Sequence, residues 1–232
     1  MPLSMEHFHI KGDPSMNTST RRLLAGLATT ALLTACGGGG GSNPAPPPAA
    51  VQPQVTLTVT NGAGLSGTLV ITLEDAKAPA TVANFLAYVA AGFYNGTVIH
   101  RNSPGFVLQG GGFAGPLVAN GTIPTAKTTN APIVLEDNAG LSNARLTVAM
   151  ARTGVADSAT SQFFINLANN TFLDRTATAR GYAVFGTVTA GADLITAMTA
   201  APCAAWPAWN ALPPGDCLPS PNLTVTSAVK TR

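Results

Sequence analysis

The sequence predicts a mainly β fold, a closed antiparallel barrel capped by two helices. Two observations predict it: many short segments with strand-like patterning, and the absence of the alternating strand–helix repeat that builds parallel sheets. The chain has 232 residues and a net charge of +2, and only 9% of its residues are charged. This low charge density argues against nucleic acid as a partner, because phosphate binding needs clustered Lys and Arg side chains.

The first predicted elements are a hairpin and a helix. Residues 55–60 and 67–74 alternate apolar and polar side chains on either side of a turn that begins at Asn61-Gly62. A helix is predicted over 79–91, where apolar side chains recur at helical spacing and form one face. Further strands are predicted near 98–101, 106–109, 133–135, 146–151, 162–166, 183–188 and 223–229, with a second helix at 192–198.

Residues 1–35 have the organisation of a signal peptide, with Met16 as an alternative start. Arg21 and Arg22 precede a short apolar segment, which is the order that signal peptides require. The segment ends in Leu-Thr-Ala-Cys36, which resembles the lipobox of bacterial lipoproteins, so Cys36 is the predicted lipidation site. A chance Cys after an apolar run is the alternative, and the paired Arg residues leave the choice between general and twin-arginine export open.

Residues 36–53 contain the predicted lipidated Cys and a linker, GGGGGSNPAPPPAAVQP, that is too rich in Gly and Pro to bury a core. Such a linker is flexible in its Gly half and extended in its Pro half, so it would hold a folded domain, residues 54–232, away from a membrane. We therefore expect a monomer anchored by lipid at the bacterial cell envelope and facing the periplasm. Gly37 after the Cys, by resemblance to enterobacterial lipoproteins, favours the outer membrane.

Three segments carry the most specific pattern of the chain. They read GTVIHRNSPGFVLQGGGF (96–113), TVAMARTGVADSATSQFFINLANNTFLD (147–174) and GYAVFG (181–186). In this order they resemble the cyclophilin family of peptidyl-prolyl cis–trans isomerases, in its bacterial form, and the resemblance extends over residues 55–229. It implies a closed eight-stranded antiparallel β-barrel capped by two helices. It also implies action on proline-containing polypeptides without a cofactor or a metal.

Arg101 is the candidate catalytic residue. Rotation about an X–Pro bond breaks the amide resonance, so a catalyst needs a donor that binds the twisted bond better than the planar one. A guanidinium is always charged and offers several N–H groups in a fixed fork. By resemblance, Arg101 is the family's catalytic Arg; a surface Arg at the end of a strand is the alternative.

The resemblance also assigns the residues around the substrate. The positions that form the proline pocket are Phe106, Val107, Phe164 and Leu173, with Ala151 as a small residue at its floor. The positions that bond the substrate backbone or hold the Arg are Gln109 and Gln162. For the apolar strand residues, ordinary core packing is the alternative.

Two further positions lie at the rim of the predicted pocket. Phe172 stands where many eukaryotic members carry a Trp that grips cyclosporin A through its indole N–H. We therefore expect weak cyclosporin binding, which a nanomolar Kd in calorimetry would contradict. Tyr182 stands near a His of many eukaryotic members and can cover the proline ring and donate one hydrogen bond.

Cys203 and Cys217 lie in a Pro- and Trp-rich insertion, residues 201–221. In an exported protein two spare cysteines suggest a disulfide, and two free thiols are the alternative. Trp206 and Trp209 either pack on the barrel or form a surface for another protein, and the sequence leaves both open.

The leading functional hypothesis is a peptidyl-prolyl isomerase that accelerates the folding of exported proteins. One alternative is an envelope chaperone or binding module that uses the same fold with little catalysis. Another is a structural lipoprotein in which the domain is a spacer. A protease-coupled assay on a proline-containing peptide separates the first hypothesis from the other two.

Overall fold

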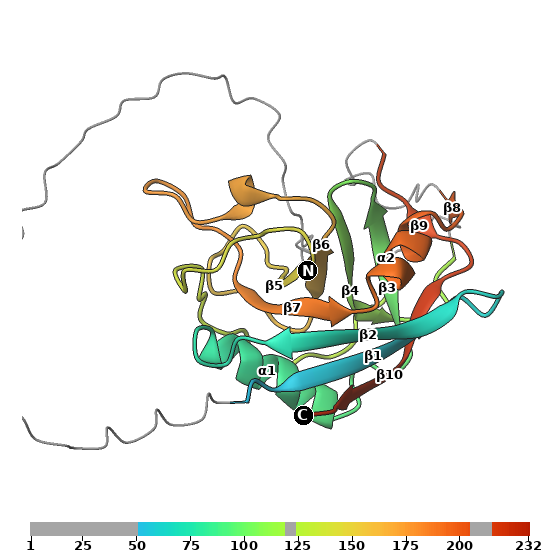
Figure 1. Cartoon of the computed structure of the whole chain (residues 1–232), viewed down its shortest axis with the longest axis horizontal. Coiled ribbons are helices and arrows are strands. Elements are labelled where there is room, and N and C mark those ends of the chain that lie inside the picture. The colour runs from blue at the N-terminus through green and yellow to red at the C-terminus, as the bar shows by residue number, and fades with distance from the viewer. Residues whose placement is uncertain (1–50, 119–123, 205–214) are drawn as a thin grey trace, which may run out of the picture. The chain divides into compact units, whose positions relative to one another are not determined.

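The computed structural model describes residues 51–118, 124–204 and 215–232. These residues form a closed barrel of eight antiparallel strands in the order β1-β10-β3-β4-β6-β5-β7-β2 (Figure 1). The predicted eight-stranded barrel with two helices is therefore confirmed. The predicted signal peptide and Cys36 lie outside the described residues, as do Trp206 and Trp209 of the insertion.

The strands of the barrel are β1 (Gln54–Thr60), β2 (Ser66–Leu73), β3 (Thr97–Ser103), β4 (Val107–Ala114), β5 (Thr147–Met150), β6 (Phe163–Asn166), β7 (Val184–Ala190) and β10 (Leu223–Lys230). A separate two-stranded sheet pairs β8 (Cys203–Ala204) with β9 (Leu218–Pro219). The helices are α1 (Pro79–Ala90) and α2 (Ala192–Thr199), and Thr171–Leu173 form a single 3-10 turn.

The hairpin of β1 and β2 follows from the alternation in its sequence. Val55 pairs with Ile71 and Leu57 pairs with Leu69, and all four side chains are buried. Since successive side chains of a strand point to opposite faces, this register directs one apolar row of each strand into the barrel. The predicted hairpin is therefore observed with its expected register.

Helix α1 contributes an aromatic side chain to the main core. The ring of Phe85 lies 5.2 Å from that of Tyr94, 5.8 Å from that of Phe163 and 5.0 Å from that of Phe185. At the start of the helix, the Glu136 carboxylate accepts hydrogen bonds from the backbone of residues 80 and 81. These bonds satisfy N–H groups that the first turn of a helix leaves without intrahelical acceptors.

One predicted strand is wrong. Residues 133–135 form no strand, and Ile133 makes only a single bridge with Ala159. The backbone N–H of Leu135 donates to the Asp157 side chain at 2.9 Å instead of joining a ladder. The backbone of this short apolar segment is therefore hydrogen-bonded through one bridge and one side chain, and no strand is needed.

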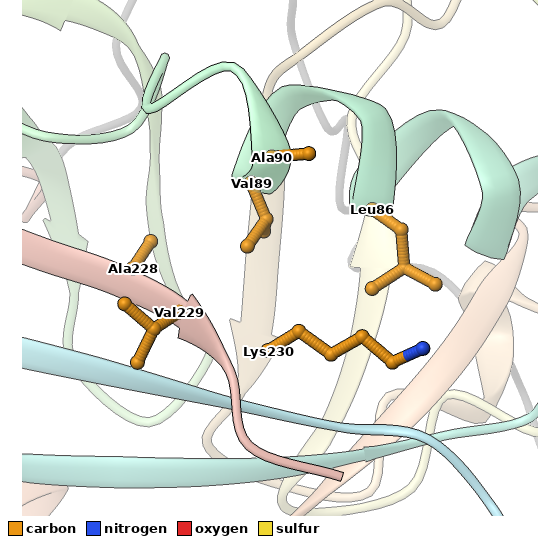
Figure 2. A pocket seen from close by; sticks show the side chains of 6 residues that line it. All are labelled: Leu86, Val89, Ala90, Ala228, Val229 and Lys230. Carbon is orange, nitrogen blue, oxygen red and sulfur yellow. The ribbon is translucent and has the colours of Figure 1, made fainter.

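Figure 2 shows a pocket between α1 and the end of β10. It is lined by Leu86, Val89, Ala90, Ala228, Val229 and Lys230. None of the residues predicted to bind substrate lines it. Among the described residues, no helix has the length and apolar character needed to cross a membrane.

Candidate active site

Arg101 lies on β3 with only 2% of its surface exposed. Its Nε donates to Oδ2 of Asp216 at 2.6 Å, and its Nη1 donates to Oε1 of Gln109 at 3.2 Å. Its Nη2 is buried and has no hydrogen-bond partner among the described residues. Buried donors are nearly always bonded, so Nη2 is the donor of Arg101 that remains for a further acceptor.

A chain of amides supports Arg101 from the neighbouring strands. Nε2 of Gln109 on β4 donates to Oε1 of Gln162 at 3.0 Å. Gly112 makes room for this arrangement, because a Cβ at that position would lie 2.7 Å from the amide carbon of Gln162. Gly112 thus allows close packing against Gln162, whereas its neighbours Gly110 and Gly111 lie close to other residues.

An apolar cluster lies beside these polar groups. It contains Val107, Ala149, Ala151, Phe164, Leu173 and Val184, and Phe106, Leu141 and Tyr182 pack against it. These side chains come from β4, β5, β6 and β7, from the 3-10 turn and from the segments that flank them. The structure therefore gathers the predicted pocket positions into one cluster.

Two aromatic pairs border the cluster. The rings of Phe106 and Phe172 stack at 5.8 Å with an interplanar angle of 19°, and Phe172 is 54% exposed. Cζ of Arg101 lies 5.7 Å from the centre of the Phe106 ring, within the range of a cation–π contact. Phe164 meets Tyr182 edge-to-face at 5.7 Å. Phe106 thus links the guanidinium to the apolar side chains.

The hydroxyl of Tyr182 stays protonated at neutral pH. Burial raises its pKa above the ordinary value of 10.0, although the positive charges of Arg152 and Arg101 act to lower it. The Arg152 guanidinium lies over the Tyr182 ring at 4.7 Å. Tyr182 therefore remains a neutral side chain beside the cluster, with Arg152 against its ring.

Buried polar side chains fix the loops that carry these residues. The side-chain amide of Asn170 donates to the Phe106 carbonyl at 2.9 Å and to Oδ1 of Asn166 at 2.8 Å. On another loop, Asp137 accepts hydrogen bonds from Arg175 and Arg180. Desolvation acts to raise the pKa of Asp137, but these hydrogen bonds outweigh it and the pKa is lowered. The carboxylate therefore stays charged and holds both arginines.

His100, which precedes Arg101, packs into the interior. Its ring meets that of Phe113 edge-to-face at 4.8 Å. Burial lowers the pKa of His100 from 6.5 to about 3, with the backbone of Val98 acting against the shift and Arg101 adding to it. The imidazole is therefore neutral at physiological pH, as a side chain packed in the interior requires.

The insertion reaches the same region through a disulfide. Cys203 and Cys217 are bonded, with their Cα atoms 5.5 Å apart. Cys217 exchanges both backbone hydrogen bonds with Asn102, each of 2.9 Å. Asp216, which precedes Cys217, is thereby placed against Arg101. Asp216 was not among the site residues predicted from the sequence motifs. It is the only charged residue of 201–221.

Comparison with known proteins identifies the family. A model described as cyclophilin type peptidyl-prolyl cis-trans isomerase matches residues 55–211. The chain belongs to the cyclophilin family. The prediction of a peptidyl-prolyl isomerase is confirmed with it.

Two bacterial relatives and one solved structure illustrate the similarity. The chain is 43% identical to peptidyl-prolyl cis-trans isomerase A of Dickeya dadantii, over 75% of this chain and 82% of that protein. It is 46% identical to peptidyl-prolyl cis-trans isomerase B of Escherichia coli, over 56% of this chain and 76% of that protein. A cyclophilin from Cryptosporidium parvum superposes with a TM-score of 0.60 at 21% identity, over 78% of this chain and 98% of that one, which shows the fold alone.

Within this cyclophilin, the predicted site residues are adjacent, and their roles stay predictions. The structure places Arg101, Gln109 and Gln162 in one hydrogen-bonded chain. It places the predicted pocket residues in one apolar cluster and Phe172 against Phe106 at its exposed border. Asp216 is the participant that the motifs did not reveal.

Proposed function

We propose that this cyclophilin accelerates cis–trans isomerisation of X–Pro bonds in exported polypeptides at the bacterial cell envelope, with Arg101 as its catalytic residue. The observation that carries the proposal is the buried Nη2 of Arg101, a charged donor without a partner in the described residues. It belongs to a guanidinium in contact with Phe106, which packs on the apolar cluster.

The geometry can supply what the reaction needs. The barrier to amide rotation is about 18–20 kcal/mol and arises from resonance between nitrogen and carbonyl. When the bond twists, the proline nitrogen regains its lone pair and becomes a better acceptor. A donor fixed at that place binds the twisted state more strongly than the planar one and lowers the barrier. No covalent bond to the protein forms.

The apolar cluster would hold the proline ring while the bond turns. Phe164, Leu173 and Ala151 are buried, and Phe106 and Tyr182 are half-buried beside them. A proline ring gains from transfer to such an environment because it leaves water. Ala151 contributes only a methyl group to the cluster. The cluster therefore favours proline over polar residues at the turning bond.

The test is a protease-coupled assay on a proline-containing tetrapeptide. We expect Arg101→Ala to lower kcat/KM by about 100-fold, or about 2.7 kcal/mol, with an unchanged circular dichroism spectrum. Arg101→Lys keeps the charge but loses the fork and should recover little of the activity. Near-normal activity in Arg101→Ala would remove the catalytic role. A wild-type protein that binds proline peptides without acceleration would favour the chaperone or binding module.

The location at the envelope is proposed from the sequence of residues 1–53. Lipidation of Cys36 would anchor the chain, since each buried CH₂ contributes about 0.8 kcal/mol and two or more acyl chains make anchoring durable. Fractionation of cells that express Cys36→Ser tests this. The variant should be absent from the membrane fraction, and its retention there would contradict the lipid anchor. Either result leaves the conclusion from the isomerase assay unchanged.

A further inference from the structure

We propose that Asp216 is a positioning residue for catalysis: held by the disulfide-linked segment, its carboxylate fixes the Arg101 guanidinium so that Nη2 is the donor left for the substrate. The inference rests on the proposed catalytic role of Arg101. It gives the insertion, which lies outside the three sequence motifs, a role in catalysis.

The donors of Arg101 are divided among three directions. A guanidinium carries one N–H at Nε and two each at Nη1 and Nη2. Asp216 takes the Nε donor at 2.6 Å, and Gln109 takes one Nη1 donor at 3.2 Å. The two fixed directions define the plane of the fork. The end that is free among the described residues is therefore Nη2.

Burial explains why the partner at Nε is an acid. The side chains of Arg101 and Asp216 are each only 2% exposed. A buried charge without a counterion costs several kcal/mol, and the guanidinium would move toward water if it were left alone. A carboxylate also forms shorter and stronger hydrogen bonds with a guanidinium than a neutral acceptor does. Asp216 therefore keeps Arg101 inside and restricts its orientation.

The backbone and the disulfide hold Asp216 in place. Cys217 pairs with Asn102 through two backbone hydrogen bonds, and Asn102 directly follows Arg101 on β3. Because side chains alternate along paired strands, this register puts Asp216 and Arg101 on the same face. The bond between Cys203 and Cys217 closes the segment covalently. The side-chain amide of Asn102 also donates to the Thr199 carbonyl at 3.1 Å.

The experiment compares Asp216→Asn with Asp75→Asn, a change at an exposed residue, in the full-length protein. We expect Asp216→Asn to lower kcat by about tenfold with KM nearly unchanged, because Asp216 orients the donor without touching the substrate. Asp75→Asn should leave both constants unchanged. In the background of Arg101→Ala, Asp216→Asn should have no further effect, as a double-mutant cycle requires of residues that act together.

Three outcomes would overturn the inference. They are an unchanged kcat in Asp216→Asn, a higher kcat, which would mean that Asp216 restrains the enzyme, and an equal loss in the Arg101→Ala background. A wild-type protein without isomerase activity would instead contradict the proposed function itself. The two failures are thereby distinguished.

A second variant covers a folding failure of Asp216→Asn. The double variant Cys203→Ser/Cys217→Ser keeps Asp216 and removes only the covalent tether. We expect its kcat to fall about threefold and to become insensitive to a reductant, which should lower the kcat of the wild-type protein to the same extent. The Arg101 Nε–H resonance in nitrogen-resolved NMR should exchange faster with water in this variant. Equal kcat and equal exchange in both proteins would contradict the positioning role.

Discussion

Two parts of the molecule hold the same guanidinium by different means. On one side, Gln109 on β4 and Gln162, which directly precedes β6, support Arg101 through neutral amides. On the other side, Asp216 supports it through a charged group on a short segment closed by a disulfide. The barrel support depends on strand packing, whereas the segment that carries Asp216 is held by backbone hydrogen bonds and also by a covalent bond that reductants break. We therefore expect a reductant to weaken the Asp216 support and to leave the glutamine support unchanged.

Removing both supports should have the largest effect. In Gln109→Ala/Asp216→Asn, the guanidinium loses both fixed directions while its charge stays buried. We expect kcat/KM to fall by about 100-fold, close to the level of Arg101→Ala. The tetrapeptide assay measures it, with thermal unfolding as a check on the fold. If the double variant loses no more than either single change, the two supports are not independent.

Removing the barrel support alone should have a smaller effect. Gln109→Ala leaves Nη1 without its acceptor and leaves Gln162 without its donor. We expect a loss of about tenfold in kcat/KM. The relative loss should be the same with and without reductant, because no disulfide lies on this side. If Gln109→Ala caused no loss of kcat/KM in the presence of reductant, the two supports would not act independently.

Gly112→Ala perturbs the barrel support indirectly. Its Cβ would lie 2.7 Å from the Gln162 amide carbon, so Gln162 must move and Gln109 must follow. We expect a loss of about threefold to fivefold in kcat/KM. Gly154→Ala is the matched control, because a Cβ there meets nothing within 4 Å. Equal activity in both variants would show that Gln162 adapts without moving its partner.

The smallest effect on catalysis is expected at His100, on the opposite face of β3 from the guanidinium. The pKa of His100 is lowered by burial to about 3 in the folded protein, from 6.5. Between pH 6.5 and 3 the unfolded chain therefore binds one more proton at His100 than the folded protein does. The contribution of His100 to the unfolding free energy is fully present above pH 6.5 and is lost as the pH falls toward 3. The slope is at most about 1.4 kcal/mol per pH unit for one proton.

Urea unfolding between pH 7 and pH 4.5 measures this effect. In His100→Gln the decline in unfolding free energy over that range should be smaller, and kcat/KM should stay within about twofold of the wild type. Desolvation acts to raise the pKa of Asp137, but its hydrogen bonds lower it, so this carboxylate stays charged over that range. An unchanged pH profile in His100→Gln would contradict the assignment of the acid sensitivity to this residue.

The barrel and its glutamines could be predicted because their residues carry local information. Alternation in residues 55–60 and 67–74 fixes which side chains enter the core, and the register of β1 with β2 follows. The motifs contain Arg101, Gln109 and Gln162. The first two lie on the paired strands β3 and β4, and Gln162 directly precedes β6, which pairs with β4. Sequence patterns therefore suffice where strand neighbours determine the contact.

Asp216 and residues 133–135 show where such patterns fail. Residues 133–135 have the composition of a strand, but their backbone forms a single bridge and a hydrogen bond with the Asp157 side chain instead of a ladder. The contact of Asp216 with Arg101 joins residues 115 positions apart, through an insertion without periodicity. Its two available signals were its isolation as the only charge of residues 201–221 and its place beside Cys217. Neither signal indicates which residue Asp216 contacts.

The meeting of the first and last strands has a practical consequence. The N–H of Gln54 donates to the carbonyl of Arg232 at 3.0 Å, and Figure 1 shows the C-terminus beside the start of β1. In a version of the domain that begins at residue 54, a few glycines could join Gln54 to Arg232, and the chain could then be reopened at the exposed Gly62–Gly64 turn between β1 and β2. Such a circular permutant would keep every strand pair of the barrel, and it would move the attachment point of any fused partner to the far tip of the hairpin.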